Sequence, residues 1–295
     1  MKTLNFDLPT GLWKIRASTG FIFLTGLVLA FSVSGQEKVV ESVPDINAQK
    51  KVLRPVASDA ASQQLVDNFL TVTGGTEAYQ NLRNVVASGT LREASQHKQF
   101  ELVESQDGKR YLRLIWQFRG RSYEHIQAYD GETVWKRETK PKLLDPEESD
   151  SLEGIHFSNH RWLVQPLVQP SISDFTFEYQ GEARVGIRKC HIVIGFGKED
   201  ERTWFYFDQE TFLLLRWGGY SEIAGVQEYV DYRASKFKRV GGVLLPTSID
   251  LIAENSPYGE VVFEKIETNQ PIDLSLFLMP AGNSPILRQN PMPEN

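Results

Sequence analysis

The strongest constraint on the fold of this chain is a succession of short segments in which residue character alternates with a period of two. In the first half these segments lie near residues 85–93, 98–105, 110–118, 121–129 and 132–138. Turn-forming pairs separate several of them: Asp107-Gly108, Arg119-Gly120 and Asp130-Gly131. Alternation is typical of a strand with one buried face, and strands joined by such short turns are antiparallel neighbours. The first half of the chain therefore predicts an antiparallel meander.

The second half continues the pattern. Further strands are expected near 175–184, 187–196, 201–208, 212–220, 226–238, 243–253 and 259–268. About a dozen strands exceed what a flat open sheet accommodates comfortably, so the sheet should curl. We therefore expect a mainly β (α+β) protein with a curled antiparallel sheet that forms an incomplete barrel, and with helices covering or plugging its concave side.

Helical patterns precede and interrupt the strands. Ser58 or Asp59 can cap a helix whose apolar stripe ends before Gly74-Gly75, and a short second helix is expected over 76–83. The polar stretch 141–151 reads as an excursion from the sheet. After it, residues 152–168 look helical, with Pro166 closing or kinking the helix.

The two ends of the chain carry other signals. An uncharged run over 21–33 follows Lys14 and Arg16 and precedes small residues, the order found in a signal peptide, so we assign 1–35 to a signal peptide. We expect a flexible linker at 36–57, one globular domain at 58–280 and a disordered tail at 281–295. The expected location is the periplasm, with secretion or retention by an uncleaved anchor as alternatives.

Net charge argues against one class of partner. The chain carries a formal charge of −6, whereas nucleic acid requires a basic face, so we expect no nucleic-acid partner. Cys190 is the only cysteine, which excludes an internal disulfide.

A search for catalytic patterns finds little. Ser221 lies in GGYSE, which lacks the second glycine of a nucleophile elbow. Glu153, His156 and His160 have the spacing that places three metal ligands on one side of a helix, but no partner comes from elsewhere and HExxH is absent. We interpret the three as a solvated helix face, and expect no catalytic residues, no metal, no cofactor and no enzymatic activity.

Large apolar side chains recur at alternate strand positions and define the candidate ligand-binding residues. From strand parity these are Leu114, Trp116, Phe177, Trp204, Tyr206, Leu215 and Trp217. They either fill the inside of the curled sheet as a solid core or line an apolar cavity, and a one-residue slip in register would turn each to the opposite face.

Four ordered segments carry a family resemblance: VDNFLTVTGGTEAYQNLRNVVASGTL (66–91), WFYFDQETFLLLR (204–216), YVDYRASKFKRVGGVLLPTSIDL (229–251) and FEKIETNQPIDLSLFLMP (263–280). Together they resemble the outer-membrane lipoprotein-sorting (LolA/LolB-like) superfamily of periplasmic carriers. The resemblance implies an incomplete barrel whose apolar concave side shelters lipid chains.

The function expected from this resemblance is a non-enzymatic periplasmic carrier or binder of a lipid or lipoprotein acyl chain. Envelope membrane proteins are expected as further partners. The alternative is a structural or interaction module of the cell envelope, with a solid core, that docks a partner protein.

Overall fold

The computed structural model describes residues 55, 57–139, 144–149, 152–168, 175–197, 201–223, 226–253 and 256–281. The expected signal peptide, most of the expected linker and all but the first residue of the expected tail lie outside these ranges. Within them, the helices are too short and too polar for any to cross a membrane.

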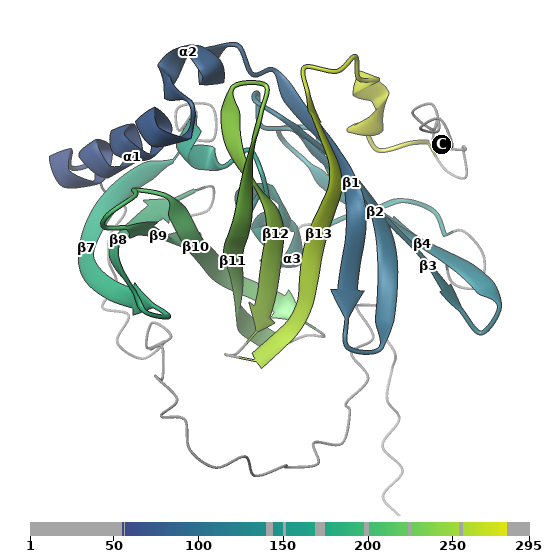
Figure 1. The fold of residues 1–295 in the computed structure, drawn as a ribbon. Coiled ribbons are helices and arrows are strands. Elements are labelled where there is room, and N and C mark those ends of the chain that lie inside the picture. The colour runs from purple at the N-terminus through teal and green to yellow at the C-terminus, as the bar shows by residue number, and fades with distance from the viewer. Residues whose placement is uncertain are drawn as a thin grey trace, which may run out of the picture.

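Two antiparallel meanders form one sheet of 13 strands among the described residues (Figure 1). The first meander contains β1 (Asn84–Glu93), β2 (Gln96–Ser105), β3 (Arg110–Phe118), β4 (Arg121–Tyr129), β5 (Val134–Glu138) and β6 (Glu147–Glu148). The second contains β7 (Thr176–Val185), β8 (Arg188–Phe196), β9 (Arg202–Asp208), β10 (Leu214–Ile223), β11 (Val226–Val240), β12 (Val243–Ala253) and β13 (Ser256–Thr268).

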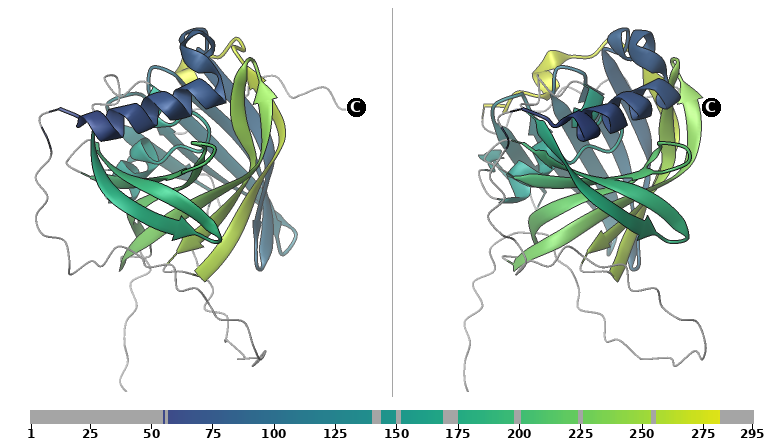
Figure 2. Two further views of the ribbon diagram at one scale, coloured as in Figure 1. Left: turned by 60° about the vertical axis from the view of Figure 1, so that its left-hand side comes forward. Right: turned by 90° about the vertical axis from the view of Figure 1, so that its left-hand side faces the viewer.

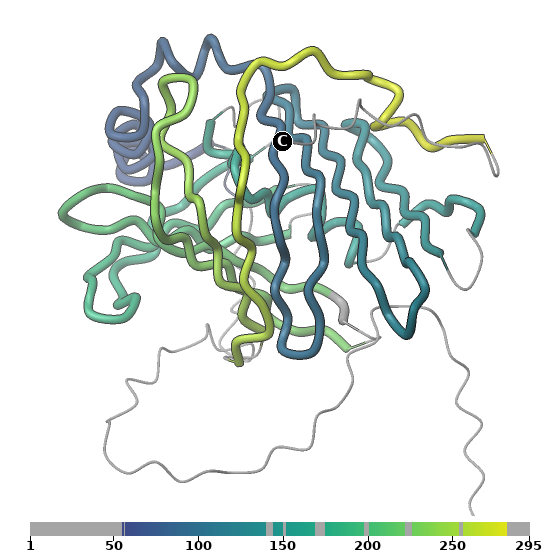
Figure 3. The backbone as a smooth tube through the Cα atoms, turned by 45° about the vertical axis from the view of Figure 1, so that its right-hand side comes forward, coloured from purple at the N-terminus to yellow at the C-terminus, as the bar shows by residue number. Residues whose placement is uncertain are grey.

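The first and last strands join the two meanders. β1 pairs with β13 in antiparallel register, from Val85 opposite Thr268 to Glu93 opposite Gly259. These strands run side by side although they are far apart in the sequence (Figure 3). The outermost strands are β6 and β7, so the curled sheet is not closed into a barrel. This arrangement confirms the expected fold class.

The tight turns follow the glycine-containing pairs. Gly108 and Gly131 adopt φ of 98° and 109°, a left-handed region that glycine enters without steric cost. Between β3 and β4, Arg119 and Gly120 both have positive φ, 50° and 72°, as a two-residue type I′ hairpin turn requires. These local rules explain why sequence alone located the strand boundaries well.

Two helices precede the sheet and lie near one end of it (Figure 2). They are α1 (Ala60–Thr73) and α2 (Gly75–Gln80). Asp59 caps α1, because its Oδ1 accepts from the backbone N–H of Ser62 at 2.8 Å. The buried face of α1 carries Leu65, Val66 and Phe69.

A third helical segment connects the two meanders. It begins with α3 (Leu152–Asn159) and ends with the 3₁₀ turn η2 (Pro166–Val168). The expectation of one helix over 152–168 is therefore wrong, since 160–165 is irregular. The C-terminal 3₁₀ turn η4 (Leu274–Leu276) packs elsewhere, where Trp135 Nε1 donates to the carbonyl of Phe277 at 2.7 Å.

Side chains on the two faces of the sheet form separate apolar clusters. The main cluster joins α1, the 157–167 segment and the inward residues of most strands. The outer cluster lies on β8–β11 and comprises Cys190, Ile194, Phe196, Trp204, Tyr206, Tyr220 and Tyr229. Because successive residues of a strand point to opposite faces, Phe205 and Phe207 belong to the main cluster while Trp204 and Tyr206 belong to the outer one.

Candidate functional site

Four of the seven candidate ligand-binding residues lie at the main cluster. Leu114, Phe177 and Trp217 are members of it and are only 3%, 1% and 1% exposed. Trp116 is partly buried and packs against it. These four side chains therefore share the inner face of the sheet.

The other three, Trp204, Tyr206 and Leu215, belong to the outer cluster or pack against it. For β10 the cause is a register irregularity between Leu214 and Arg216, where the pairing with β9 shifts by one residue. Such a bulge reverses the alternation of faces along the strand. Leu215 and Trp217 consequently point to opposite faces, although the sequence places them two residues apart, and the seven residues do not form one wall.

An apolar ladder runs along the inner face of β3 and becomes more exposed toward the end of the strand. Leu112 is 7% and Leu114 is 3% exposed, Trp116 is partly buried, and Phe118 is 45% exposed. Tyr123 of β4 stacks on Trp116 at a centroid distance of 5.7 Å and meets Phe118 edge-on at 6.4 Å. An aromatic surface thus leads from solvent into the main cluster.

A cation adjoins this ladder. Lys98 Nζ lies 5.2 Å from the centroid of the Trp116 ring and 2.8 Å from Glu93 Oε1. Its side chain is only 9% exposed. The ammonium group is therefore held at the partly exposed end of the ladder by a carboxylate and an aromatic face.

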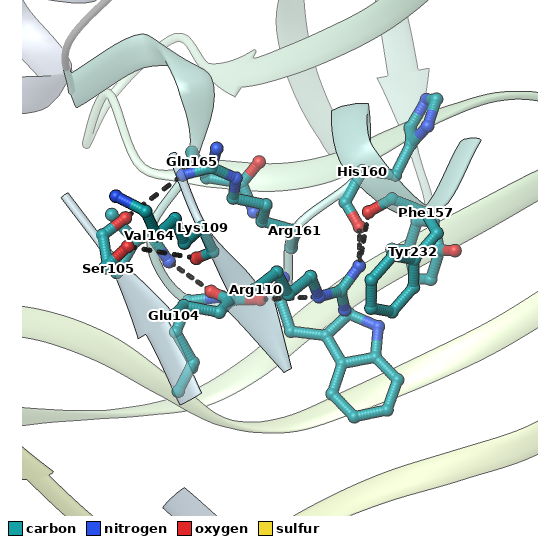
Figure 4. A network of polar contacts seen from close by, with 12 residues as sticks. Glu104, Ser105, Lys109, Arg110, Phe157, His160, Arg161, Val164, Gln165 and Tyr232 are labelled. Atoms are coloured by element: carbon teal, nitrogen blue, oxygen red, sulfur yellow. Dashed lines mark hydrogen bonds and ion pairs between the residues drawn. The ribbon is translucent and has the colours of Figure 1, made fainter. Parts of the chain in front are cut away.

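The buried carboxylate of Glu104 fixes the segment that follows α3 (Figure 4). Its Oε1 accepts from the backbone N–H of Trp162 at 2.9 Å, and its Oε2 accepts from Leu163 at 2.9 Å and Val164 at 2.7 Å. Three successive N–H groups aimed at one carboxylate form an anion-binding turn. This turn replaces helical hydrogen bonding and explains why α3 stops at Asn159.

Two buried arginines complete the network around Glu104. Arg110 Nε lies 3.2 Å from Glu104 Oε1, and its Nη1 donates to the carbonyls of Phe157 and His160 at 2.9 and 2.8 Å. Arg161 Nη2 donates to the carbonyl of Gly108 at 2.6 Å. The network has the geometry of a structural clamp that holds the 157–164 segment against β2 and β3.

The histidines of α3 are not on a solvated face. His156 and His160 are 7% and 0% exposed, and their rings stack at a centroid distance of 3.9 Å. Glu153, the third member of the sequence-based set, pairs instead with Lys136 at 3.2 Å. The solvated-face interpretation is therefore wrong for both histidines, because α3 lies against the inner side of β10 rather than on the surface.

Glu201, the residue directly before β9, takes the third place beside the histidines. Its Oε1 lies 3.8 Å from His156 Nδ1 and 3.7 Å from His160 Nδ1, while its Oε2 accepts from the side-chain amide of Asn159. The Glu201 side chain is 9% exposed, and Oε1 is buried without a hydrogen bond. His156, His160 and Glu201, named here the His–Glu cluster, are the described residues grouped closely enough to share one metal ion.

Burial sets the protonation of the His–Glu cluster. It raises the pKa of Glu201 to about 8, against the opposing effect of the Asn159 hydrogen bond. It lowers the pKa of His160 to about 4, and burial together with the neighbouring His160 lowers the pKa of His156 well below its ordinary value. At neutral pH the His–Glu cluster without an ion therefore holds neutral imidazoles beside a protonated carboxyl.

Hydroxyl groups face the other imidazole nitrogens. His156 Nε2 lies 2.7 Å from the hydroxyl of Tyr232, and His160 Nε2 lies 3.1 Å from that of Thr203. Gly219 of β10 makes room for the second ring, since a Cβ there would lie 2.5 Å from His160 Nε2 and 2.6 Å from the carbonyl oxygen of Arg202. The sequence analysis did not identify Glu201 or Glu104 as site residues. The available signal was the pair Gly218-Gly219 inside β10, because glycine within a strand often marks the close approach of another part of the chain.

Comparisons with known proteins give similarity in fold only. No family model matches the chain, and no curated protein matches it in sequence. A DUF1329 family protein from Desulfovibrio piger is 11% identical over 73% of this chain and 96% of its own, with a TM-score of 0.48. A domain described as an outer-membrane lipoprotein-sorting protein, from Vibrio parahaemolyticus, is 9% identical over 74% and 96%, with a TM-score of 0.47.

A LolA superfamily protein from Nitrosomonas europaea is 11% identical over 73% of this chain and 96% of its own, with a TM-score of 0.47.

Proposed function

We propose that this protein is a non-enzymatic carrier or binder of a lipid or lipoprotein acyl chain, exported to the periplasm. The observation that carries the proposal is the ladder on β3, where Trp116 and Phe118 continue the buried apolar wall out to solvent. An acyl chain laid on such a surface is stabilised by about 0.8 kcal/mol for each buried CH₂ group, without specific hydrogen bonds. The sequence resemblance to lipoprotein-sorting carriers supports the same function.

The proposed binding surface is the inner-face subset of the candidate residues. The acyl chain contacts Trp116 first, then Leu114, with Phe177 and Trp217 deeper in the main cluster. Because the deeper side chains are already packed, full entry requires α1 or the 157–168 segment to move outward. Trp204, Tyr206 and Leu215 stand on the opposite face and are not part of this surface.

Lipid capture by the exported protein tests the proposal. The full chain is expressed with residues 1–35 in place and purified from the soluble periplasmic fraction without refolding. Bound lipid is measured by extraction and mass spectrometry, and binding of added lipid is measured with a fluorescent fatty acid. Trp116→Glu places a charge in the ladder and is expected to abolish both signals. Ile187→Glu, at a residue that is 90% exposed in the β7–β8 turn, is the matched control and should bind as the original protein does.

Two outcomes would contradict the carrier: an original protein that neither carries nor binds lipid, or equal binding by the Trp116 and Ile187 variants. Circular dichroism of each variant verifies that the fold is retained.

A second candidate is the interaction module with a solid core. The observation that favours it is the close packing of Leu114, Phe177 and Trp217 at 1–3% exposure. β7 is an edge strand of the sheet. Residues 58 and 59 form hydrogen bonds with its first half, at Phe177 and Tyr179, and not with the stretch 180–185. That stretch is the edge on which a partner protein would dock. A lipid-free protein in the capture experiment is the result expected of this candidate.

A further inference from the structure

The proposed carrier function does not involve the residues of the His–Glu cluster. Two imidazoles and one carboxylate, all on the inner side of the sheet, form a ligand set suited to zinc and similar divalent ions. His156 lies in α3 and His160 directly follows the last residue of that helix, whereas Glu201 comes from a different part of the chain and directly precedes β9. A site made from two elements answers the objection that the α3 residues alone lacked a partner from elsewhere.

Geometry supports a shared ion. The Glu201 Oε1 atom faces the Nδ1 atoms of both histidines at 3.7 and 3.8 Å. Ligand atoms about 2.0–2.2 Å from a tetrahedral zinc ion lie roughly 3.3–3.5 Å from one another, so the two Oε1–Nδ1 distances exceed that value by only a few tenths of an ångström. One ligand atom from each of the three residues lies within 4.8 Å of the others. Nδ1 of His156 lies 3.3 Å from the carbonyl oxygen of Tyr220, and Nδ1 of His160 lies 3.1 Å from that of His156. Binding of the ion therefore exchanges these two contacts for bonds to the metal and places each imidazole proton on Nε2.

The buried Oε1 atom of Glu201 is the second, independent observation. Its side chain is more than nine-tenths buried, yet this oxygen accepts no hydrogen bond and is aimed between the two imidazole rings. Buried carboxylate oxygens are ordinarily satisfied, and one without a partner commonly marks an ion or a water. The Asn159 amide holds the other oxygen and so orients the carboxylate toward the histidines.

An outer shell is already in place for the metal-bound form. When Nδ1 binds a metal, Nε2 carries the proton and needs an acceptor, which the hydroxyls of Tyr232 and Thr203 provide at 2.7 and 3.1 Å. A hydroxyl donates as readily as it accepts, so the same pair satisfies the imidazoles without the ion. The nearby cation Arg110 is paired with Glu104 and with backbone carbonyls, and its charge is thereby offset.

We propose that His156, His160 and Glu201 bind one divalent transition-metal ion of the zinc class through the two Nδ1 atoms and Oε1, with water in the fourth position and with release to solvent of the proton that the Glu201 carboxyl holds without the ion. The ion ties α3 to the β8–β9 end of the sheet. The inference is independent of lipid binding, since it uses none of the ladder residues.

The test is metal binding by the full chain, prepared without an affinity tag and stripped with a chelator. Titration with Co²⁺, followed by its visible absorption, and with Zn²⁺, followed by calorimetry, should show one equivalent bound. Zn²⁺ should also raise the thermal unfolding midpoint, because an ion that binds only the folded state stabilises it.

Glu201→Gln is the decisive variant, because it keeps the size of the side chain and an oxygen for the Asn159 amide while it removes the anionic ligand. It should weaken Zn²⁺ binding by more than the roughly 10- to 100-fold that loss of an outer-shell partner costs. Glu153→Gln is the matched control: it makes the same charge change on α3 at a residue that pairs with Lys136, and should bind as the original protein does.

Three results would overturn the site: no binding of either ion by the original protein, equal binding by Glu201→Gln, or loss of binding in Glu153→Gln. If Glu201→Gln fails to fold, His156→Gln takes its place, and the titration of the original protein decides independently of any variant.

Discussion

Gly219 occupies the middle of β10, where most residues would favour the strand more than glycine does. The imidazole of His160 and the carbonyl of Arg202 fill the space where a Cβ would project, at 2.5 and 2.6 Å. Real Cβ atoms do not approach other atoms this closely, so glycine at this position permits His160, which directly follows α3, and the backbone at the start of β9 to lie against β10.

Gly219→Ala should therefore destabilise the protein. Because the carbonyl of Arg202 is backbone and cannot rotate away, relief requires β9 or α3 to shift, and we expect a loss of about 1–3 kcal/mol in the free energy of unfolding. Urea denaturation followed by tryptophan fluorescence measures it. An unchanged or raised stability would show that the strands accommodate the methyl group.

Asp59 links helix α1 to the sheet through backbone hydrogen bonds from both elements. Oδ1 accepts from Ser62 at 2.8 Å within the first turn of the helix, and Oδ2 accepts from Tyr179 of β7 at 2.7 Å. Burial of Asp59 opposes its ionisation, but these backbone N–H groups outweigh burial and lower the pKa of its carboxyl below the ordinary value of 3.8.

Asp59→Ala should cost about 1–2 kcal/mol of stability at neutral pH, through loss of the helix cap and of the bond to β7. Because the folded-state pKa lies below the unfolded one, the contribution is complete above about pH 4 and is lost as pH falls through the folded value. The stability difference between the original protein and the variant, from urea titrations at several pH values, should thus narrow on acidification. A difference that widens toward low pH would contradict this account.

At the scale of elements, features set by local signals could be predicted from the sequence, whereas features set by long-range contacts could not. Most strands and their turns could be placed because alternation and glycine-containing pairs act within a few residues, as at Gly108 and Gly131. The two-residue strand β6 was missed, because it lies in the stretch 141–151 that the sequence analysis assigned to an excursion from the sheet. The end of α3 could not be placed, since it depends on Glu104, which is more than fifty residues away. The face assigned to Leu215 failed for a similar reason, because a bulge against β9 changes the alternation without marking the sequence.

The candidate site was predicted less completely than the fold. The spacing of His156 and His160 correctly placed two imidazoles on one helix face, but only tertiary structure shows that this face is buried and that Glu201 meets it. Strand parity brought Leu114, Trp116, Phe177 and Trp217 to one face. Strand parity could not predict that Leu114, Phe177 and Trp217 are only 1–3% exposed, because their burial depends on helices from other parts of the chain.

In the described part of the chain, the two meanders share a ladder at β1 and β13, and the segment 152–168 lies between them in the sequence. On one side this segment is held by Glu104 and Arg110 of β2 and β3, and on the other by contacts of His160 with Thr203. Because the segment 152–168 contacts both meanders, we expect it to brace the concave side of the open sheet and to limit how far the two meanders can separate.

Glu104→Gln tests this bracing. The change leaves Arg110 and Arg161 buried without a compensating carboxylate, and breaking a buried ion pair in this way costs about 3–5 kcal/mol. Glu101→Gln is the matched control, because Glu101 lies on the same strand three residues earlier and points to the opposite, exposed face. Its carboxylate pairs with Arg113 at 55% exposure, where such a pair contributes about 0–1 kcal/mol.

Hydrogen exchange measured by mass spectrometry locates the effect. Because Glu104 accepts from three backbone N–H groups, peptides covering 157–168 should lose protection first in Glu104→Gln, ahead of peptides covering β1 and β13. Uniform loss of protection across both meanders would mean that the segment 152–168 is part of a single cooperative unit rather than a brace that can open on its own. Equal stability of the Glu104 and Glu101 variants would show that the arginines find other partners.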